Sequence, residues 1–545
     1  MQNNVKQDRI GIVDIEKYLL EENADKIKVP KFKLSQSLLN LRKNNEPQFK
    51  KILESETKNL GPVLGPLVKK TINAAVEADS TVEVGEPVTT RVQMRQYVSA
   101  ALRCIVAQSD AEHPEAINKE WLATFLCTCC SIRYVQKSDE LMIFDGLKFV
   151  EAKGPVGDML VVLLNYDGFD TWTSTIESHV IDLLKHKAPK IDLSDLNKNF
   201  YGFNKMDLNL ATYEMEPPHP DHYVTMRSPI EPSEMATPVF DAFLKATFDD
   251  PTERQFAFSW LGSMFQVNRA GDSVLFMHSS GASGKSTLMT VWREICGAEN
   301  VSSIKVQELG GQFGKQDLLG RVALITDENE PAKFDVATVK AISTGSPISV
   351  DQKFKKRVTM VPTLKMAFAF NVLPEAETTI GFFRRLILLP FAHTFEGDKA
   401  DKHLIEKIRP EYPGIAFKAL DELKRLAKDN FNFPESSAMV DAKNEYFDSS
   451  LSAVRLFIRE NLIAKGDEEL ARDVILNRFK AWVKDSSSDE NGYTKPKRFW
   501  SEYKNACRAE LGISYAERKS GRKIVLGVSF RNDETENEGD ETDNA

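Results

Sequence analysis

Nine consecutive residues near the middle of the chain have the types and spacing needed to bind a phosphate. They are Ser279, Ser280, Gly281, Ala282, Ser283, Gly284, Lys285, Ser286 and Thr287. The two glycines let backbone N–H groups turn toward an anion, and the dipole of a following helix adds positive potential. Lys285 would reach the β- and γ-phosphates of ATP, and the Ser286 hydroxyl would bind Mg²⁺.

The segments on either side are those that a phosphate-binding P-loop requires. An apolar run at 273–278 predicts a strand before the stretch, and residues 288–293 predict a helix after it. Ser279 departs from the motif, because it stands where a first glycine is usual. A chance turn of small residues before a helix is the alternative, and the two flanking elements disfavour it.

A second apolar run ends in two carboxylates. Residues 321–328 predict a buried strand that ends in two carboxylates, Asp327 and Glu328, about forty residues after Lys285. In open α/β sheets the chemistry lies at the carboxyl ends of the strands. Asp327 would therefore hold Mg²⁺ through water, while Glu328 would orient and polarise the attacking water.

Two later features have the residue types of an ATPase site. The strand predicted at 364–370 ends in Asn371, whose amide would bond the γ-phosphate or the lytic water. An Asx turn before a nearby proline is the alternative.

Arg384 and Arg385 open a very apolar strand and suit an arginine finger that reaches a neighbouring subunit's nucleotide. We favour Arg385, which immediately precedes the strand; a pair of surface arginines is the alternative.

Alternating residues at 344–358 predict a β-hairpin with a basic tip. The cations of this tip surround one phenylalanine and are Lys353, Lys355, Lys356 and Arg357. In a ring of subunits such tips would line a pore and bind the phosphates of DNA. A solvated basic turn is the alternative.

Composition limits the class of protein. With 545 residues the chain should hold roughly three to four domains. The net charge of −9 means that polyanion binding must come from local basic surfaces. No apolar run approaches the ~20 residues of a membrane span, and residues 1–8 are polar, so we expect a cytoplasmic protein without a membrane partner. Cys127, Cys129 and Cys130 predict a buried helix rather than a metal site, because no second ligand pair lies nearby.

The C-terminal part predicts a winged-helix domain. Residues 474–483 are helical, Pro496 opens another helix, and residues 515–529 form a hairpin with a basic turn. The cations expected on duplex DNA are Lys497, Arg498, Arg522 and Lys523. A winged helix that docks protein is the alternative.

The predicted fold class is an α/β P-loop NTPase core between an α-rich N-terminal region and this C-terminal domain. The expected divisions are 1–95 (helical, of unknown role), 96–240 (an α+β collar-like domain), 241–430 (the ATPase core), 431–530 (the winged helix) and 531–545 (an acidic disordered tail).

The order of these features resembles the superfamily 3 helicases, and within them the poxvirus, phage and plasmid helicase-primase ATPase family. That order is the P-loop, the Asp-Glu strand, the basic hairpin, Asn371, and the arginine pair before Leu-Pro-Phe. The similarity covers about residues 120–530. It implies an AAA+-like core, a hexameric ring, Mg²⁺-dependent ATP hydrolysis, and 3′→5′ translocation on single-stranded DNA. The roles of Lys285, Ser286, Asp327, Glu328 and Asn371 follow from the same resemblance.

We therefore expect a replicative DNA helicase of a virus, phage or mobile element, located in the host cytoplasm. Its expected partners are single-stranded and forked DNA, other copies of the chain, and a separate primase or polymerase. Residues 1–270 lack an Asp-x-Asp pair with a downstream Ser-x-His, so primase activity is not expected here. The rival classes are an ATP-switched origin-binding initiator and a packaging or loading ATPase. A small-molecule kinase would leave the arginine pair and the hairpin without a role.

Overall fold

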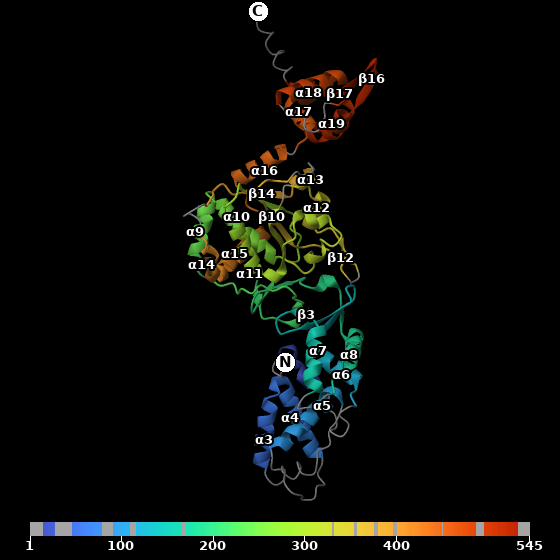
Figure 1. Cartoon of the computed structure of the whole chain (residues 1–545), viewed down its shortest axis with the longest axis vertical. Coiled ribbons are helices and arrows are strands. Elements are labelled where there is room, and N and C mark those ends of the chain that lie inside the picture. Colours follow the sequence, from blue (N-terminus) through green and yellow to red (C-terminus); the bar gives the residue numbers. More distant parts are fainter. Residues whose placement is uncertain are drawn as a thin grey trace, which may run out of the picture.

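The computed structural model is a mixed α/β structure in which three bodies follow one another along the long axis (Figure 1). It describes residues 15–27, 46–78, 91–108, 116–165, 171–329, 332–353, 357–374, 380–395, 401–449, 451–486 and 495–531. Among these residues, no helix is both long and apolar enough to cross a membrane.

The N-terminal body is mainly helical. Its longer helices are α3 (Glu46–Lys58), α4 (Gly61–Ala78), α5 (Arg91–Ala107), α6 (Lys119–Cys129), α7 (Lys153–Leu164) and α8 (Ser174–Lys187). A sheet in the order β3-β2-β1-β4 is formed by β1 (Ile132–Val135), β2 (Glu140–Phe144), β3 (Phe149–Glu151) and β4 (Lys190–Ile191). Buried apolar side chains from Ile15 to Ala188 form one cluster. This cluster crosses the predicted boundary between residues 95 and 96.

The cysteine-rich segment belongs to the core of this body. Cys127 and Cys129 lie on α6, Cys130 ends it, and Cys129 and Cys130 are buried. Burial raises the pKa of the Cys129 thiol to about 12, which disfavours the thiolate that metals bind. The prediction of a buried helix is confirmed.

A small antiparallel sheet connects the N-terminal body to the central one. It is formed by β5 (Phe200–Gly202), β6 (Asp207–Asn209) and β7 (Met215–Glu216). Its buried side chains, including Tyr201 and Leu208, belong to the same cluster as those of the central helices. The segment therefore packs with the central body, although the sequence prediction assigned it to the preceding domain.

The central body is built on a parallel sheet in the order β14-β8-β13-β10-β9. Its strands are β8 (Val274–His278), β9 (Val301–Ser302), β10 (Ala323–Asn329), β13 (Lys365–Phe370) and β14 (Leu386–Pro390). Every residue of β13 is buried. Side chains of β8 alternate between two hydrophobic clusters, with Leu275 and Met277 in one and Val274 and Phe276 in the other. Burial of both faces explains why these strands are continuous apolar runs in the sequence.

Helices cover both faces of this sheet. The cluster that contains Leu275 and Met277 also includes residues of five helices: α9 (Pro238–Thr247), α10 (Pro251–Phe265), α11 (Lys285–Cys296), α14 (Leu404–Ile408) and α15 (Tyr412–Lys428). The cluster that contains Val274 and Phe276 also includes residues of α12 (Val336–Ser343), α13 (Ile380–Phe383) and α16 (Ser437–Ser449). The strands predicted at 273–278, 321–328 and 364–370 are confirmed within one or two residues.

The C-terminal body has its own hydrophobic core. Its elements are α17 (Ala453–Asn461), β15 (Leu462–Ala471), α18 (Arg472–Ser486), α19 (Pro496–Leu511), β16 (Glu517–Ser520) and β17 (Arg522–Phe530). The antiparallel sheet has the order β15-β17-β16. The two predicted helices and the terminal hairpin are confirmed, whereas the predicted acidic tail after Arg531 lies outside the described residues.

Candidate functional site

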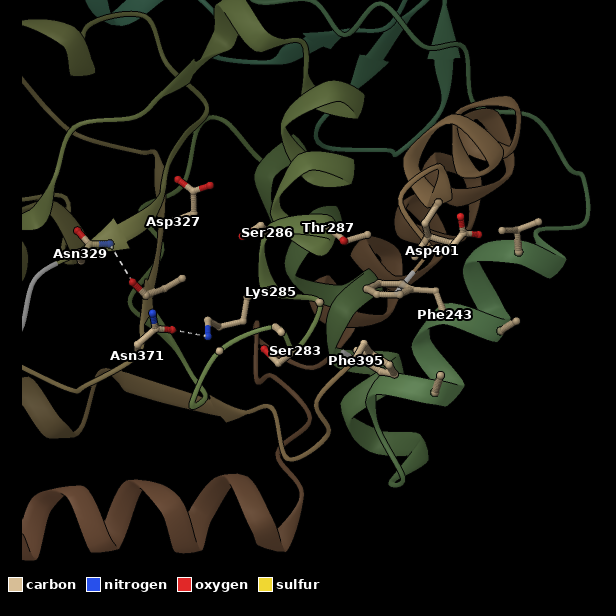
Figure 2. A pocket seen from close by; sticks show the side chains of 18 residues that line it. Phe243, Ser283, Lys285, Ser286, Thr287, Asp327, Asn329, Asn371, Phe395 and Asp401 are labelled. Atoms are coloured by element: carbon tan, nitrogen blue, oxygen red, sulfur yellow. Dashed lines mark hydrogen bonds between the residues drawn. The ribbon is translucent and has the colours of Figure 1, made fainter. Parts of the chain in front are cut away.

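The carboxyl ends of β8, β10 and β13 meet at a cavity of about 650 Å³. The residues of the predicted phosphate-binding stretch that line it are Gly281, Ala282, Ser283, Gly284, Lys285, Ser286 and Thr287. Figure 2 shows that the cavity has two different ends. Polar groups of Lys285, Asp327 and Asn371 gather at one end, and the rings of Phe243 and Phe395 lie at the other.

The loop between β8 and α11 is bent by residues with positive φ. The φ angles of Gly281, Ala282 and Gly284 are 125°, 45° and 90°. A Cβ atom at Gly284 would lie 3.0 Å from a ring carbon of Phe243, so glycine also allows the loop to approach α9. No side chain caps α11, which begins at Lys285. Its first N–H groups remain available at the cavity, as anion binding by a helix N-terminus requires.

Ser279, the residue that departs from the motif, organises the interior of this loop. Its hydroxyl accepts hydrogen bonds from the Lys285 ammonium, from the Ser283 hydroxyl at 2.8 Å and from the Gly281 N–H at 3.2 Å. Serine at this position therefore orders the loop through its side chain. Burial of Lys285 lowers the pKa of its ammonium group.

Asn371 meets the same lysine from the next strand of the sheet. The Lys285 Nζ donates to Asn371 Oδ1 at 3.1 Å. The Ser279 N–H donates to the Phe370 carbonyl at 3.3 Å, which ties the loop to the end of β13. The amide predicted to contact the γ-phosphate or the lytic water thus lies beside the predicted phosphate-binding lysine.

The end of β10 carries one residue that the sequence analysis predicted for this site and one that it missed. Asp327 is half-buried and lines the cavity. Asn329 lies past a register shift in the strand pairing, and its buried amide donates to the Ala369 carbonyl at 3.2 Å and to the Thr326 carbonyl at 3.0 Å. The missed asparagine therefore fixes the ends of β10 and β13 against each other. The side chain of Glu328 lies outside the described residues.

The apolar end of the cavity was also missed. It is formed by α9 and by residues that follow β14, namely Val239, Ala242, Phe243, Ala246, Phe395, Asp401 and Leu404. The Glu411 carboxylate holds α9 in place, because it accepts the N–H groups of Val239 and Phe240, each at 2.9 Å. The Phe395 N–H donates to the Ala282 carbonyl at 2.7 Å, which joins this wall to the phosphate-binding loop. No motif in the sequence marks these residues.

The arginine pair lies at the amino-terminal ends of the strands, whereas the cavity lies at their carboxyl ends. The pairing of β14 with β8 sets Leu386 beside Val274 and Pro390 beside His278. Arg385 precedes this pairing and is level with Ser273, so it stands about 20 Å along the strands from Ser279, where the phosphate-binding loop begins. Its guanidinium donates to the Gly381 carbonyl at 2.6 Å, whereas the side chain of Arg384 is exposed. Neither side chain lines the chain's own cavity.

The basic hairpin is partly described. Strands β11 (Ile348–Val350) and β12 (Val358–Met360) pair antiparallel, as predicted. Lys353 is exposed at the tip, and Arg357 pairs with the Asp351 carboxylate at 2.5 Å. Lys355 and Lys356 lie outside the described residues.

The cations predicted on the C-terminal body lie on α19 and on the terminal hairpin. Lys497 and Arg498 are exposed in the first turn of α19. The Lys523 ammonium lies 3.7 Å from the Glu517 carboxylate. The side chain of Arg522 is outside the described residues.

Comparison with known proteins gives two similarities. Residues 277–385, from the end of β8 to the arginine pair, match a family described as "Family of unknown function (DUF5906)". Solved apo structures of the NrS-1 C-terminal region resemble the chain, covering 73% of it and 96% of their own length at 13% sequence identity. Their TM-scores are 0.43 and 0.44. At these values the likeness establishes neither a shared fold nor a shared activity.

Proposed function

We propose that this chain is an ATP-dependent DNA helicase with a P-loop ATPase core of the superfamily 3 type. The observation that carries the proposal is the convergence of Lys285, Ser286, Asp327 and Asn371 on one cavity. They come from two strand ends and one helix N-terminus, which is where open α/β sheets hold their ligands.

The two ends of the cavity fit the two ends of a nucleotide. Phosphates would lie against the N–H groups that begin α11 and against the Lys285 ammonium. The base would lie between apolar side chains of α9 and the Phe395 ring. The cavity volume of about 650 Å³ is in the range of small-ligand sites.

The donors present also fit Mg²⁺. The Ser286 hydroxyl and the Asp327 carboxylate line one end of the cavity, and both offer the oxygen ligands that this ion prefers. Bound there with ATP, the ion would neutralise charge on the phosphates. Glu328 would orient the attacking water, and Asn371 would donate a neutral hydrogen bond to that water or to the γ-phosphate.

The arginine pair supports a shared site in a ring. Arg384 and Arg385 lie at the edge of the sheet away from the cavity, so they would act only on the nucleotide of an adjacent subunit. A hexamer that moves 3′→5′ would bring the hairpin tips, including Lys353, to a central strand of DNA. The C-terminal body would contact forked or duplex DNA through α19, and a separate primase or polymerase would act with the ring in the host cytoplasm.

The deciding experiment is unwinding of a forked DNA with ATP and Mg²⁺. The matched variants are Lys285→Ala, which should abolish nucleotide binding, and Lys355→Ala with Lys356→Ala. The double variant should keep basal hydrolysis and lose both unwinding and stimulation by single-stranded DNA. Its DNA binding should also depend less on salt, by up to about one unit of slope for each phosphate that the variant no longer neutralises.

One observation favours a second candidate, an ATP-switched initiator or loading ATPase. In the β11–β12 hairpin Arg357 pairs with Asp351, and in the β16–β17 hairpin Arg518 pairs with Glu469. Such pairing reduces the positive potential available to DNA. Nucleotide-dependent assembly on DNA without strand displacement would select this candidate over the helicase.

A further inference from the structure

Helix α16 is the last helix before the C-terminal body, and it packs against the same sheet that forms the cavity. Figure 1 shows α16 between the central body and the C-terminal helices. Its Tyr446 is only 6% exposed and belongs to the cluster on one face of the sheet. The ring of Tyr446 lies 5.4 Å from that of Phe383 and 6.4 Å from that of Phe276, measured between centroids.

The hydroxyl of this tyrosine holds the segment that carries Asn371. It donates to the Pro374 carbonyl at 2.6 Å. Pro374 is three residues beyond Asn371, on the segment that leaves β13. Asn371 is therefore held by Lys285 on the cavity side, while its segment is held by α16 on the other side.

His278 is a titratable group next to the same asparagine. His278 ends β8 and hydrogen-bonds the backbone of Asn371, and the charges of Lys285 and Glu445 both act on it. Burial is the main cause that lowers the pKa of His278. Tyr446 thus supplies the contact of α16 with the segment that carries Asn371.

We propose that Tyr446 is a positioning residue that couples the nucleotide state of the cavity to the C-terminal body through α16. This inference rests on the proposed function, because it requires a nucleotide in the cavity. A γ-phosphate would compete with Asn371 for the Lys285 ammonium, and release of Asn371 would shift the end of β13. The shift would reach Pro374, then Tyr446, and then α17, which begins at Ala453 soon after α16 ends.

The test is hydrogen exchange of the full-length chain with and without the non-hydrolysable analogue AMP-PNP and Mg²⁺. The variant is Tyr446→Phe, which removes only the hydroxyl and keeps the ring contacts. The matched control is Tyr213→Phe, which also removes one hydrogen bond, from the Tyr213 hydroxyl to Gln266 Oε1 at 3.2 Å. Tyr213 packs against the cluster on one face of the sheet, whereas Tyr446 belongs to the cluster on the other face.

In the wild type and the control, AMP-PNP should change exchange in peptides of α16 and α17 by several-fold. In Tyr446→Phe that change should disappear while the affinity for AMP-PNP stays within two-fold, and kcat should fall without a change in KM. AMP-PNP binding with the same exchange response in Tyr446→Phe as in the wild type would overturn this inference alone. Failure of the wild type to bind AMP-PNP would overturn the proposed function and this inference with it.

Discussion

The Lys285 Nζ lies 3.1 Å from Asn371 Oδ1, and this contact joins the loop after β8 to the end of the neighbouring strand β13. Ser279 shares the same ammonium group from within the loop. A phosphate that enters the cavity must therefore compete with two neutral oxygens. The charged phosphate should win, because it attracts the ammonium as an opposite charge, whereas the oxygens of Asn371 and Ser279 are neutral.

The first prediction separates binding from turnover. Lys285→Ala should weaken ATP binding by at least about a hundred-fold, because the ammonium that contacts the phosphates is removed. Asn371→Ala should bind ATP within a few-fold of the wild type and lower kcat by roughly ten- to a hundred-fold, since the amide acts on the reacting groups. Glu328→Gln should behave like the asparagine variant. Fluorescent-nucleotide titration and steady-state hydrolysis measure the two effects.

Lys428→Ala, at an exposed position where α15 ends, is the control for removal of a lysine. Equal loss of affinity in Lys285→Ala and Asn371→Ala would contradict the division of roles.

The second prediction concerns the apolar end of the cavity. Phe395→Ala keeps the backbone bond to the Ala282 carbonyl and removes the ring that would contact the base. The ring would stabilise the ground state and the transition state equally, so KM for ATP should rise roughly ten-fold, or about 1.4 kcal/mol, while kcat stays the same. Hydrolysis measured over a range of ATP concentrations gives both constants. A fall in kcat with unchanged KM would show that the ring does not hold the base.

The sequence predicts the polar half of this site because its residues follow strands. Strands β8, β10 and β13 are buried on both faces, so each appears as an apolar run whose carboxyl end is easy to locate. Lys285, Asp327 and Asn371 all lie at or soon after the ends of such runs. Parallel pairing then brings the three side chains together without further information.

The apolar half could not be predicted in the same way. Phe243 and Phe395 are two of 32 phenylalanines, and no local pattern separates a ring that lines a cavity from one in the core. Asn329 was missed because its role depends on a register shift at the end of β10. The pairing of Arg357 with Asp351 depends on how the ends of the hairpin face each other, which composition does not reveal.

The third prediction concerns pH and a buried lysine at the amino end of β13. Lys365 is 3% exposed, and its Nζ donates to three carbonyl oxygens, those of Gln266, Arg269 and Thr363. Burial lowers the pKa of Lys365 to about 7. Between that value and the ordinary lysine pKa of about 10.4, the unfolded chain binds more protons at this position than the folded chain. The free energy of unfolding should therefore rise with pH across this window, by up to a few kcal/mol from this group.

Thermal unfolding of the wild type and of Lys365→Met between pH 7 and pH 9.5 measures the effect. The wild type should gain stability relative to the variant as the pH rises, because the variant has no group that titrates there. Lys428→Met, at an exposed position, should follow the wild type at every pH. A constant difference between the wild type and Lys365→Met would show that Lys365 stays charged in its three-carbonyl site.

The last prediction concerns the arginine pair. Arg385 is tied to the Gly381 carbonyl at 2.6 Å, whereas Arg384 is exposed and can extend from the edge of the sheet. Because of this difference, we expect Arg384 rather than Arg385 to be the arginine finger. Arg384→Ala should bind ATP normally and lower kcat by about 10³-fold or more, because an arginine finger acts on the charge of the transition state.

Mixing subunits shows whether the site is shared. Arg384→Ala subunits keep an intact Glu328, and Glu328→Gln subunits keep an intact arginine. A mixed ring would therefore contain some interfaces with both groups, and hydrolysis should recover above the level of either variant alone. If Arg385 only holds its own turn, hydrolysis should not recover when Arg385→Ala subunits are mixed with Glu328→Gln subunits. With subunit exchange verified by mass measurement, no recovery for either arginine at any ratio would contradict a site built between two subunits.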